Sequence, residues 1–300
     1  MRAYLELLRL PNVFTAMADI LLGFLFTHER LEPWPQFALL LGASGLLYLG
    51  GMVLNDYFDR QQDARERPQR PIPSGRIRAG TAQRLGLGML AGGVALGCGA
   101  AVAAGTWLPA IVAVLLAACV LAYDSGLKRT PGGPLAMGAC RTLNVLLGMS
   151  VAIEPWQPVH WVVAGGVGLY IVGVTLFARR EAAVSGRVQL MAGTLILVAG
   201  IALLSSAPRW VTGNEWPPVA APPRWYVFWG LIGLLIAWRC LRAVIEPRPA
   251  NVQAAVRNCI FALVILDAGA VLAVQDRMWA LVILTLLIPT MFLGRWIYST

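Results

Sequence analysis

The feature that most constrains this chain is its succession of long apolar segments. Its 300 residues are 58% hydrophobic and only 13% charged, whereas soluble domains carry about 25% charged residues. Apolar runs of about 20 residues between short polar loops are typical of transmembrane helices. The sequence therefore predicts an all-α fold, a polytopic bundle of nine or ten transmembrane helices in one domain over residues 1–300. The expected segments are 11–27, 37–55, 80–104, 107–123, 134–152, 159–178, 188–206, 225–244, 252–274 and 278–296.

The cationic side chains, 23 arginines and one lysine, gather in alternate loops and give the chain a net charge of +9. If the N-terminus is cytoplasmic, 19 of these 24 cations face the cytoplasm, as the positive-inside rule favours. The pattern indicates membrane topology and not a nucleic-acid surface, so no nucleic-acid partner is expected. The Arg-, Ala- and Gly-rich composition favours a bacterial source. We therefore predict an integral protein of the bacterial inner (cytoplasmic) membrane, in contact with its lipids.

One polar stretch, residues 55–63, stands out at the end of the second apolar segment and holds three of the chain's seven aspartates. On a helix, Asp56, Asp59 and Asp63 share one face, and Asn55 lies one turn before Asp59. Crowded oxygen ligands repel one another unless a cation lies between them, and Mg²⁺ commonly links carboxylates to substrate phosphates. The stretch therefore predicts a Mg²⁺ site with Asn55, Asp56, Asp59 and Asp63 as ligands, on the cytoplasmic side. Plain solvated acids are the alternative.

A loop rich in Arg and Pro follows this stretch. Arg67 and Arg70 offer forked donors for phosphate oxygens, and the prolines lower the entropy lost when the loop is ordered. The loop therefore predicts that an anion with phosphate groups binds beside the metal.

The pattern Asn-Asp-x-x-Asp-x-x-x-Asp over 55–63, followed by Arg-Pro-x-Arg-Pro-Ile-Pro-Ser-Gly over 67–75, resembles the signature of UbiA-type intramembrane prenyltransferases. The opening Arg-Leu-Pro-Asn over 9–12 is similar to that family's entry into the first helix. The resemblance implies a helix bundle around a central cavity. It implies Mg²⁺-dependent binding of a polyprenyl diphosphate and transfer of the prenyl group to an aromatic or other lipophilic acceptor, with no obligate protein partner. Asn12 is then a substrate-binding residue, and Asp59 and Asp63 are catalytic.

A second motif, residues 123–129 (Tyr-Asp-Ser-Gly-Leu-Lys-Arg), follows the fourth apolar segment. It resembles the family's tyrosine-to-lysine loop, in which the cation helps to hold diphosphate. The resemblance implies that Tyr123 binds substrate and that Lys128, the only lysine of the chain, acts in catalysis. The alternative is a cationic loop that only fixes the membrane topology.

A third motif places Arg141 and Asn144 three residues apart in an otherwise apolar helix. A buried arginine is costly and normally has a partner, so a structural ion pair is one explanation. We favour the other, a substrate-binding pair on the wall of a cavity. The segment also resembles a divergent branch, the UbiA-like proteins of the "ebo" metabolite clusters, which implies action on, or export of, lipophilic small molecules.

The chain departs from the family pattern after the sixth apolar segment. Typical members carry a second Asp-rich motif there, whereas this chain has Arg179, Arg180 and Glu181. We expect Glu181 to contribute to the metal site. Arg179 and Arg180 are expected to neutralise diphosphate directly.

An aspartate deep in the ninth segment, Asp267, is a further candidate for substrate binding, because an acid inside a membrane marks a functional site by default. Asp19 in the first segment falls under the same rule. A structural partner for an arginine is the alternative for both. Two functions follow from the motifs: a prenyltransferase, or a non-catalytic UbiA-like protein that binds or helps to export a lipophilic metabolite.

Overall fold

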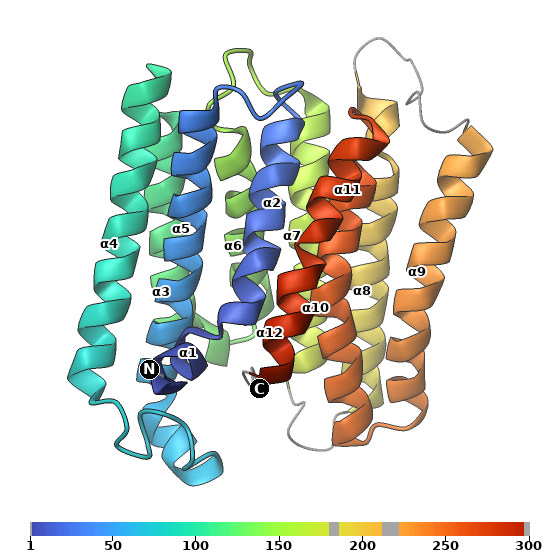
Figure 1. The fold of residues 1–300 in the computed structure, drawn as a ribbon. Coiled ribbons are helices and arrows are strands. Elements are labelled where there is room, and N and C mark those ends of the chain that lie inside the picture. The colour runs from blue at the N-terminus through green and yellow to red at the C-terminus, as the bar shows by residue number, and fades with distance from the viewer. Residues whose placement is uncertain (1, 180–185, 212–221, 297–300) are drawn as a thin grey trace.

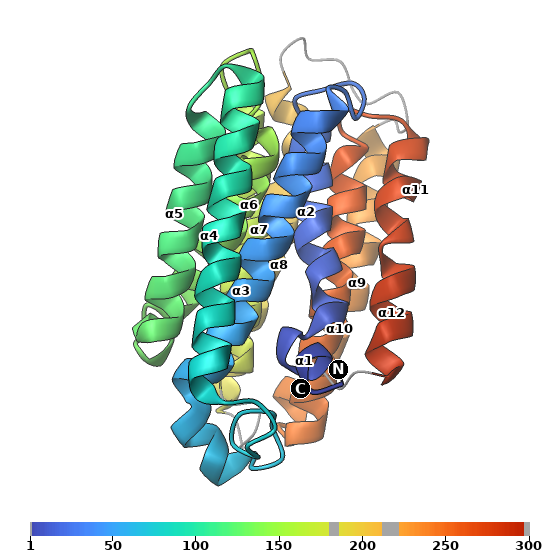
Figure 2. The same ribbon diagram turned by 60° about the vertical axis from the view of Figure 1, so that its left-hand side comes forward.

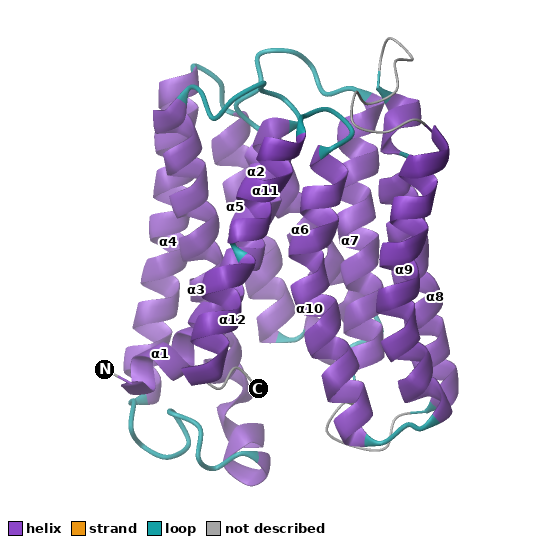
Figure 3. Ribbon diagram, turned by 45° about the vertical axis from the view of Figure 1, so that its right-hand side comes forward, coloured by secondary structure: helices purple, strands orange, loops and turns teal. Residues whose placement is uncertain are grey.

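The computed structural model describes residues 2–179, 186–211 and 222–296. Throughout these ranges the chain is built from helices and contains no β-strand (Figures 1 and 3). The all-α prediction is therefore confirmed. The α-helices are α1 (Arg2–Leu8), α2 (Val13–Leu25), α3 (Trp34–Glu66), α4 (Ala79–Ala104), α5 (Leu108–Ser125), α6 (Gly133–Met149), α7 (Pro158–Ala178), α8 (Arg187–Ser205), α9 (Pro222–Ile245), α10 (Pro249–Val271), α11 (Arg277–Thr285) and α12 (Leu287–Trp296). Three short 3-10 helices join them: η1 (Leu10–Asn12), η2 (Leu127–Arg129) and η3 (Ala207–Trp210).

The helices cross the molecule from end to end, as transmembrane segments do. In the described ranges, nine helical stretches are long and apolar enough to span a membrane. Helix α6, with 17 residues, is shorter but also runs between the two ends, from the close of α5 to the start of α7. The start of α1 and the end of α12 lie at the same end of the bundle (Figure 1), as an even number of crossings requires. The described helices therefore make ten crossings, within the predicted nine or ten.

Two predicted segments differ in detail from the helices observed. The last one, 278–296, is divided into α11 and α12, with the break at Leu286. The second, 37–55, belongs to the much longer α3, which has 33 residues. At about 1.5 Å per residue such a helix is about 50 Å long, whereas the hydrocarbon core of a membrane is about 30 Å thick. The last turns of α3 therefore extend past the neighbouring helices (Figure 2), and they carry the Asp-rich stretch.

A close approach of two glycines fixes α6 against α2. A methyl group added at Gly148 would lie 2.6 Å from the carbonyl oxygen of Ile20 and 3.2 Å from Cα of Gly23. Small residues of this kind let transmembrane helices pack with their backbones nearly in contact. The contact sets the distance at which polar side chains of α2 and α6 meet farther along the pair.

Candidate active site

Two adjoining cavities lie near the end of the bundle where α3 ends and α6 begins. The larger one, here called the polar cavity, has a volume of about 580 Å³ and charged walls. The smaller one, the apolar pocket, has a volume of about 140 Å³ and mainly hydrophobic walls. Tyr123 near the end of α5 belongs to both walls. Among the described residues, those that line the two cavities lie between Arg9 and Arg179, and none belongs to the described parts of α8 to α12.

One face of α3 forms the acidic wall of the polar cavity. Asn55, Asp59, Gln62 and Glu66 line it and are spaced by four, three and four residues, which places them on one side of a helix. Asp63 lines the same cavity. The structure thus brings together the predicted Asn55, Asp59 and Asp63. Gln62 and Glu66 were not predicted, although the same helical spacing would have found them.

The two aspartates of this wall are paired with cations from other parts of the chain. Lys128 Nζ lies 2.7 Å from Asp59 Oδ2, and an Arg129 nitrogen lies 3.3 Å from Asp59 Oδ1. Arg70 lies 2.8 Å from Asp63 Oδ2. The positive charge between the predicted carboxylates is therefore supplied in this structure by the protein itself. Lys128 and Arg70, both predicted to hold diphosphate, also line the polar cavity.

Asp56 does not lie on the cavity wall, in contrast to its predicted place among the metal ligands. It is only 4% exposed, and its Oδ1 accepts hydrogen bonds from Arg9 at 2.7 Å and from Arg70 at 3.4 Å. On the helix it faces the segment that precedes α2. The prediction missed this partner because Arg9 is 47 residues away along the chain.

The oxygen ligands of the polar cavity fit Mg²⁺ in combination with phosphate oxygens. Among the described residues, no three Asp, Glu, His or Cys side chains gather into a metal site of their own. Mg²⁺ usually takes one or two carboxylates and completes its octahedron with waters and substrate phosphates. Asn55, Asp59 and Asp63 offer oxygen ligands of that kind on one wall, beside cations suited to phosphate.

The tyrosine-to-lysine loop is tied to α3 by a buried aspartate. Asn55 Nδ2 donates to Asp124 Oδ1 at 2.9 Å, and Lys128 Nζ lies 3.9 Å from the same oxygen. Asp124 is only 3% exposed. Its position explains how residues from α3 and from the loop after α5, about 70 positions apart, reach one cavity.

Two further predicted cations line the polar cavity without an acidic partner. Arg67 and Arg179 both belong to its wall, and neither forms an ion pair with an acid in the ranges the structure covers. Arg179 donates to the carbonyl oxygen of Thr130 at 3.0 Å. Unpaired guanidinium groups beside paired aspartates leave the cavity with a surplus of positive charge. Arg180 and Glu181, the other predicted residues of this segment, lie outside the described residues.

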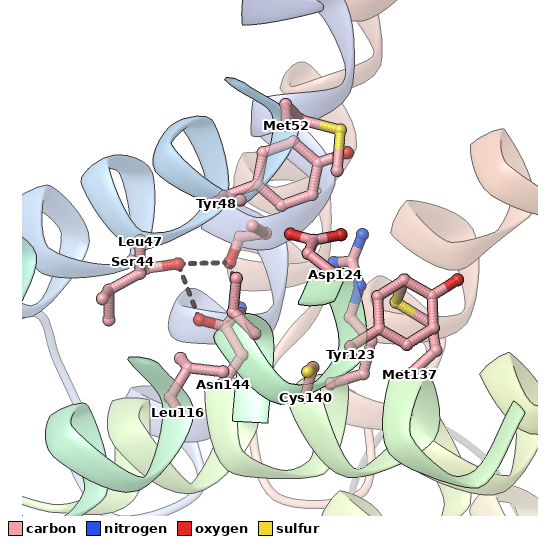
Figure 4. Close-up of a pocket in the computed structure, with 14 residues that line it drawn as sticks. Ser44, Leu47, Tyr48, Met52, Leu116, Tyr123, Asp124, Met137, Cys140 and Asn144 are labelled. Atoms are coloured by element: carbon pink, nitrogen blue, oxygen red, sulfur yellow. Dashed lines mark hydrogen bonds between the residues drawn. The ribbon is translucent and has the colours of Figure 1, made fainter. Parts of the chain in front are cut away.

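The apolar pocket ends on a polar floor that includes the predicted Arg141 and Asn144. Figure 4 shows Asn144 facing Ser44, with the ring of Tyr123 at another part of the pocket wall. Ser44 Oγ donates to Asn144 Oδ1 at 2.7 Å. Arg141 makes an ion pair of 2.9 Å with Asp19 of α2 and donates to Thr15 Oγ1 at 2.8 Å. Both explanations of Arg141 therefore apply: it forms a structural ion pair and also lines a cavity.

Two residues predicted to bind substrate lie outside both walls. Asn12 ends η1, and its carbonyl oxygen accepts a hydrogen bond from Thr15. Asp267 of α10 is completely buried, with Asp19 as its neighbour. Asp267 is deeply buried because α2, α7, α9 and α11 pack around α10.

Comparison with known proteins agrees with the resemblance seen in the sequence. The profile of the UbiA prenyltransferase family matches residues 16–266. Digeranylgeranylglyceryl phosphate synthase of Methanopyrus kandleri is 35% identical over 161 residues, which are 52% of this chain and 57% of that protein. The synthase of the same name from Ignicoccus hospitalis is 34% identical over 158 residues, 52% of this chain and 49% of that protein. The chain thus spans about half the length of the curated relatives it matches. These relatives do not point specifically to the predicted ebo branch.

Solved structures share the arrangement of helices. A structure described as digeranylgeranylglyceryl phosphate synthase in membranes has a TM-score of 0.66 and 20% identity, and the match covers 91% of this chain and 97% of that one. A UbiA homolog from Archaeoglobus fulgidus bound to GPP and Mg²⁺ has a TM-score of 0.60 and 13% identity, with 94% and 99% covered. At such identities the likeness confirms the fold, an all-α bundle of this type.

Proposed function

Because the chain is a member of the UbiA prenyltransferase family, we propose that it transfers a prenyl group from a polyprenyl diphosphate to a lipophilic acceptor within the membrane, with Mg²⁺ as cofactor. The observation that carries the proposal is the contact of two unlike cavities across Tyr123. One is charged and suits a diphosphate, and the other is apolar and suits a hydrocarbon chain. A prenyl diphosphate has these two parts, joined at the bond that breaks.

The polar cavity would hold the diphosphate end of the donor. Asn55, Asp59 and Asp63 would hold Mg²⁺ together with phosphate oxygens, and Glu181 stays a predicted ligand. When bound, Mg²⁺ would offset the negative charge that grows on the diphosphate as the allylic C–O bond breaks. Arg67 and Arg179, which have no acidic partner in the described chain, would bind phosphate oxygens directly.

Lys128 and Arg70 would stabilise the departing diphosphate. In the absence of substrate each is paired with an aspartate, at 2.7 Å and 2.8 Å respectively. Phosphate oxygens that enter the cavity would share these cations with Asp59 and Asp63. Fixed cations placed where charge develops are a large contribution to catalysis, and here they need no rearrangement of the backbone. Arg180 stays a predicted diphosphate-binding residue.

The apolar pocket would receive the hydrocarbon next to the reacting carbon. Its volume of about 140 Å³ is close to that of a cavity of about 150 Å³ which stays dry and binds benzene. It therefore has room for a short part of a prenyl chain. A pocket with apolar walls would exclude water. An allylic cation formed beside Tyr123 would therefore react with the acceptor and not with water.

The acceptor is the second substrate of the proposed reaction. The synthase names of the relatives support a lipophilic glyceryl phosphate as the first acceptor to test, and an aromatic acceptor as the second. The excess of positive charge in the polar cavity supports an acceptor that carries a phosphate group. We further propose that the polar cavity faces the cytoplasm of a bacterial inner membrane, in line with the distribution of arginines.

The second candidate function is binding or export of a lipophilic metabolite, as in the predicted ebo-like branch. It is favoured by one observation: Arg179 lies on the cavity wall at the segment where typical members have their second Asp-rich motif. In this case the polar cavity would recognise an anion without breaking a bond.

The two functions are separated by an assay of diphosphate release. Purified protein in detergent or nanodiscs is incubated with Mg²⁺, geranylgeranyl diphosphate and each acceptor. We expect release in wild type and a fall of at least about 100-fold in Asp59→Ala, because a charged group is removed from the site of bond breaking. Asp276→Asn is the control, since Asp276 is exposed at the start of α11, far along the chain from the cavity.

Equal release in wild type and Asp59→Ala would refute the enzymatic proposal. No release from any variant, combined with thermal stabilisation by Mg²⁺ and diphosphate together, would support the binding function instead.

A further inference from the structure

A second charged cluster lies deep in the bundle, behind the apolar pocket. Asp19 of α2 and Asp267 of α10 are both 0% exposed. Arg141 of α6 donates to Asp19 Oδ2 at 2.9 Å, and Asn144 Nδ2 donates to the same oxygen at 2.9 Å. Helices α2 and α6 are therefore joined at one carboxyl group. Neither acid is among the described residues that line the polar cavity or the apolar pocket, so the proposed reaction does not use them directly.

The two carboxyl groups face each other with no donor between them. Each lies within hydrogen-bonding reach of the other. Among the described residues, Asp19 Oδ1 and both oxygens of Asp267 have no hydrogen-bond partner. A carboxylate only accepts hydrogen bonds, whereas a protonated carboxyl group also donates one. Buried acceptors without a donor are costly, and one proton between the two groups satisfies one oxygen of each acid.

The charges of the cluster require the same proton. Arg141 is the one cation in the described chain that forms an ion pair with either acid, at 2.9 Å from Asp19 Oδ2. With both acids ionised, the three groups would carry a net negative charge inside an apolar bundle, which is strongly disfavoured. With one proton the cluster is neutral. The nearby hydroxyl of Tyr170 cannot supply a bond, because it donates to the carbonyl oxygen of Cys259 at 2.8 Å.

We propose that Asp19 and Asp267 share one proton, and that Asp267 acts through Asp19 as a positioning residue for Arg141. Asp267 carries the shared proton and donates it to Asp19 Oδ1, so Oδ2 remains available to Arg141 and Asn144. These two side chains form the polar floor of the apolar pocket. The pair thereby sets the depth and shape of the pocket that receives the prenyl chain. This second part rests on the proposed function, whereas the shared proton does not.

The shared proton is tested by infrared spectroscopy of the purified protein, without substrate. A protonated carboxyl group has a stretching band apart from the amide bands, and the band shifts in heavy water. We expect this band in wild type and its loss in Asp267→Asn and in Asp19→Asn, since each variant leaves one acid to balance Arg141. The exposed Asp276→Asn should keep the band.

Absence of the band from wild type, or its presence at full strength in Asp267→Asn, would overturn the shared proton. Thermal stability that depends on sodium, in a wild-type protein without the band, would show that the two acids hold a metal cation instead and would also overturn it.

The positioning role is tested with two variants at the same residue. Asp267→Leu fills the space but leaves Asp19 Oδ1 without a donor, so KM for the prenyl diphosphate should rise about tenfold, the effect of one unsatisfied buried group. Asp267→Asn still donates to Asp19 and should restore most of the affinity, while kcat changes less than KM in both. Equal KM values in wild type and both variants would refute positioning. If Asp267→Leu does not fold, a tenfold higher KM in Asp267→Asn would refute it as well. Failure of the proposed function would look different: the wild-type protein would show the infrared band of the protonated carboxyl group but no prenyltransferase activity.

Discussion

Replacing Arg70 by methionine tests whether the loop after α3 is held by its buried ion pairs. Arg70 lies 2.8 Å from Asp63 and 3.4 Å from Asp56, and its side chain is 11% exposed. Asp56 keeps a second partner, Arg9 at 2.7 Å, so the loss there is small. Asp63, only 5% exposed, has no other cation partner in the described chain. The change therefore removes one full charge-assisted hydrogen bond and leaves one buried carboxylate unpaired.

The expected cost is about 1.5–3 kcal/mol, the range for a hydrogen bond to a charged group. Thermal unfolding of the protein in detergent measures it, and the scaling of soluble domains gives a fall in Tm of roughly 5 °C. Arg76→Met in the same loop is the matched control. Arg76 pairs with Glu6 at 2.7 Å, but its side chain is 41% exposed, and exposed pairs contribute only about 0–1 kcal/mol.

A double variant separates the cost of the unpaired Asp63 carboxylate from the loss of its hydrogen bond with Arg70. Adding Asp63→Asn to Arg70→Met removes the unpaired carboxylate, so most of the lost stability should return. The reasoning is wrong if Arg70→Met is as stable as wild type, if Arg76→Met loses as much, or if the double variant is less stable than Arg70→Met alone.

Three other predictions concern the metal, the leaving group and the helix packing. Chelation with EDTA should abolish diphosphate release and added Mg²⁺ should restore it; release that continues after chelation would contradict a metal requirement. Lys128→Met should lower release about 100-fold, and Arg129→Met much less, because Arg129 is 60% exposed; the reverse order in the same assay would exclude Lys128 as the main cation. Gly148→Ala should destabilise the protein by about 1–3 kcal/mol, because its methyl group meets Ile20 in a packed core. Gly230→Ala, with open space around it, is the control, and equal Tm values for the two variants would contradict the packing argument.

The helices and one wall of the site could be predicted from the sequence, because both depend on local pattern. Apolar runs of membrane length predicted the crossings. Helical spacing predicted Asp56, Asp59 and Asp63 on one face, with Asn55 one turn before Asp59; of these, Asn55, Asp59 and Asp63 line the polar cavity and Asp56 does not. The family resemblance, carried by residues 55–75, is confirmed by the profile match. In each case the signal lies within a few turns of a single helix.

The partners of the acids could not be predicted, because they come from distant parts of the chain. Arg9 and Asp56 are 47 positions apart, Lys128 and Asp59 are 69 apart, and Arg141 and Asp19 are 122 apart. A basic loop identifies many possible cations for each carboxylate, and only packing selects one. For the same reason the sequence could not show that Lys128 pairs with Asp59 and Arg70 with Asp63.

In the described chain, both cavity walls come from residues 9–179. Sequences of this kind can therefore diverge more freely after these residues than within them. Helices α8 and α9 contribute no wall residue, so selection on them acts through lipid contact and packing and not through substrate. Substitutions that keep these helices apolar should accumulate there at little cost to activity. In a complete scan of single substitutions scored by activity, tolerated changes should therefore be frequent on the outer faces of α8 and α9 and rare around α3 and α5. Homologous proteins would keep the chemistry of the first part while the second part adapts to membranes of different thickness and composition.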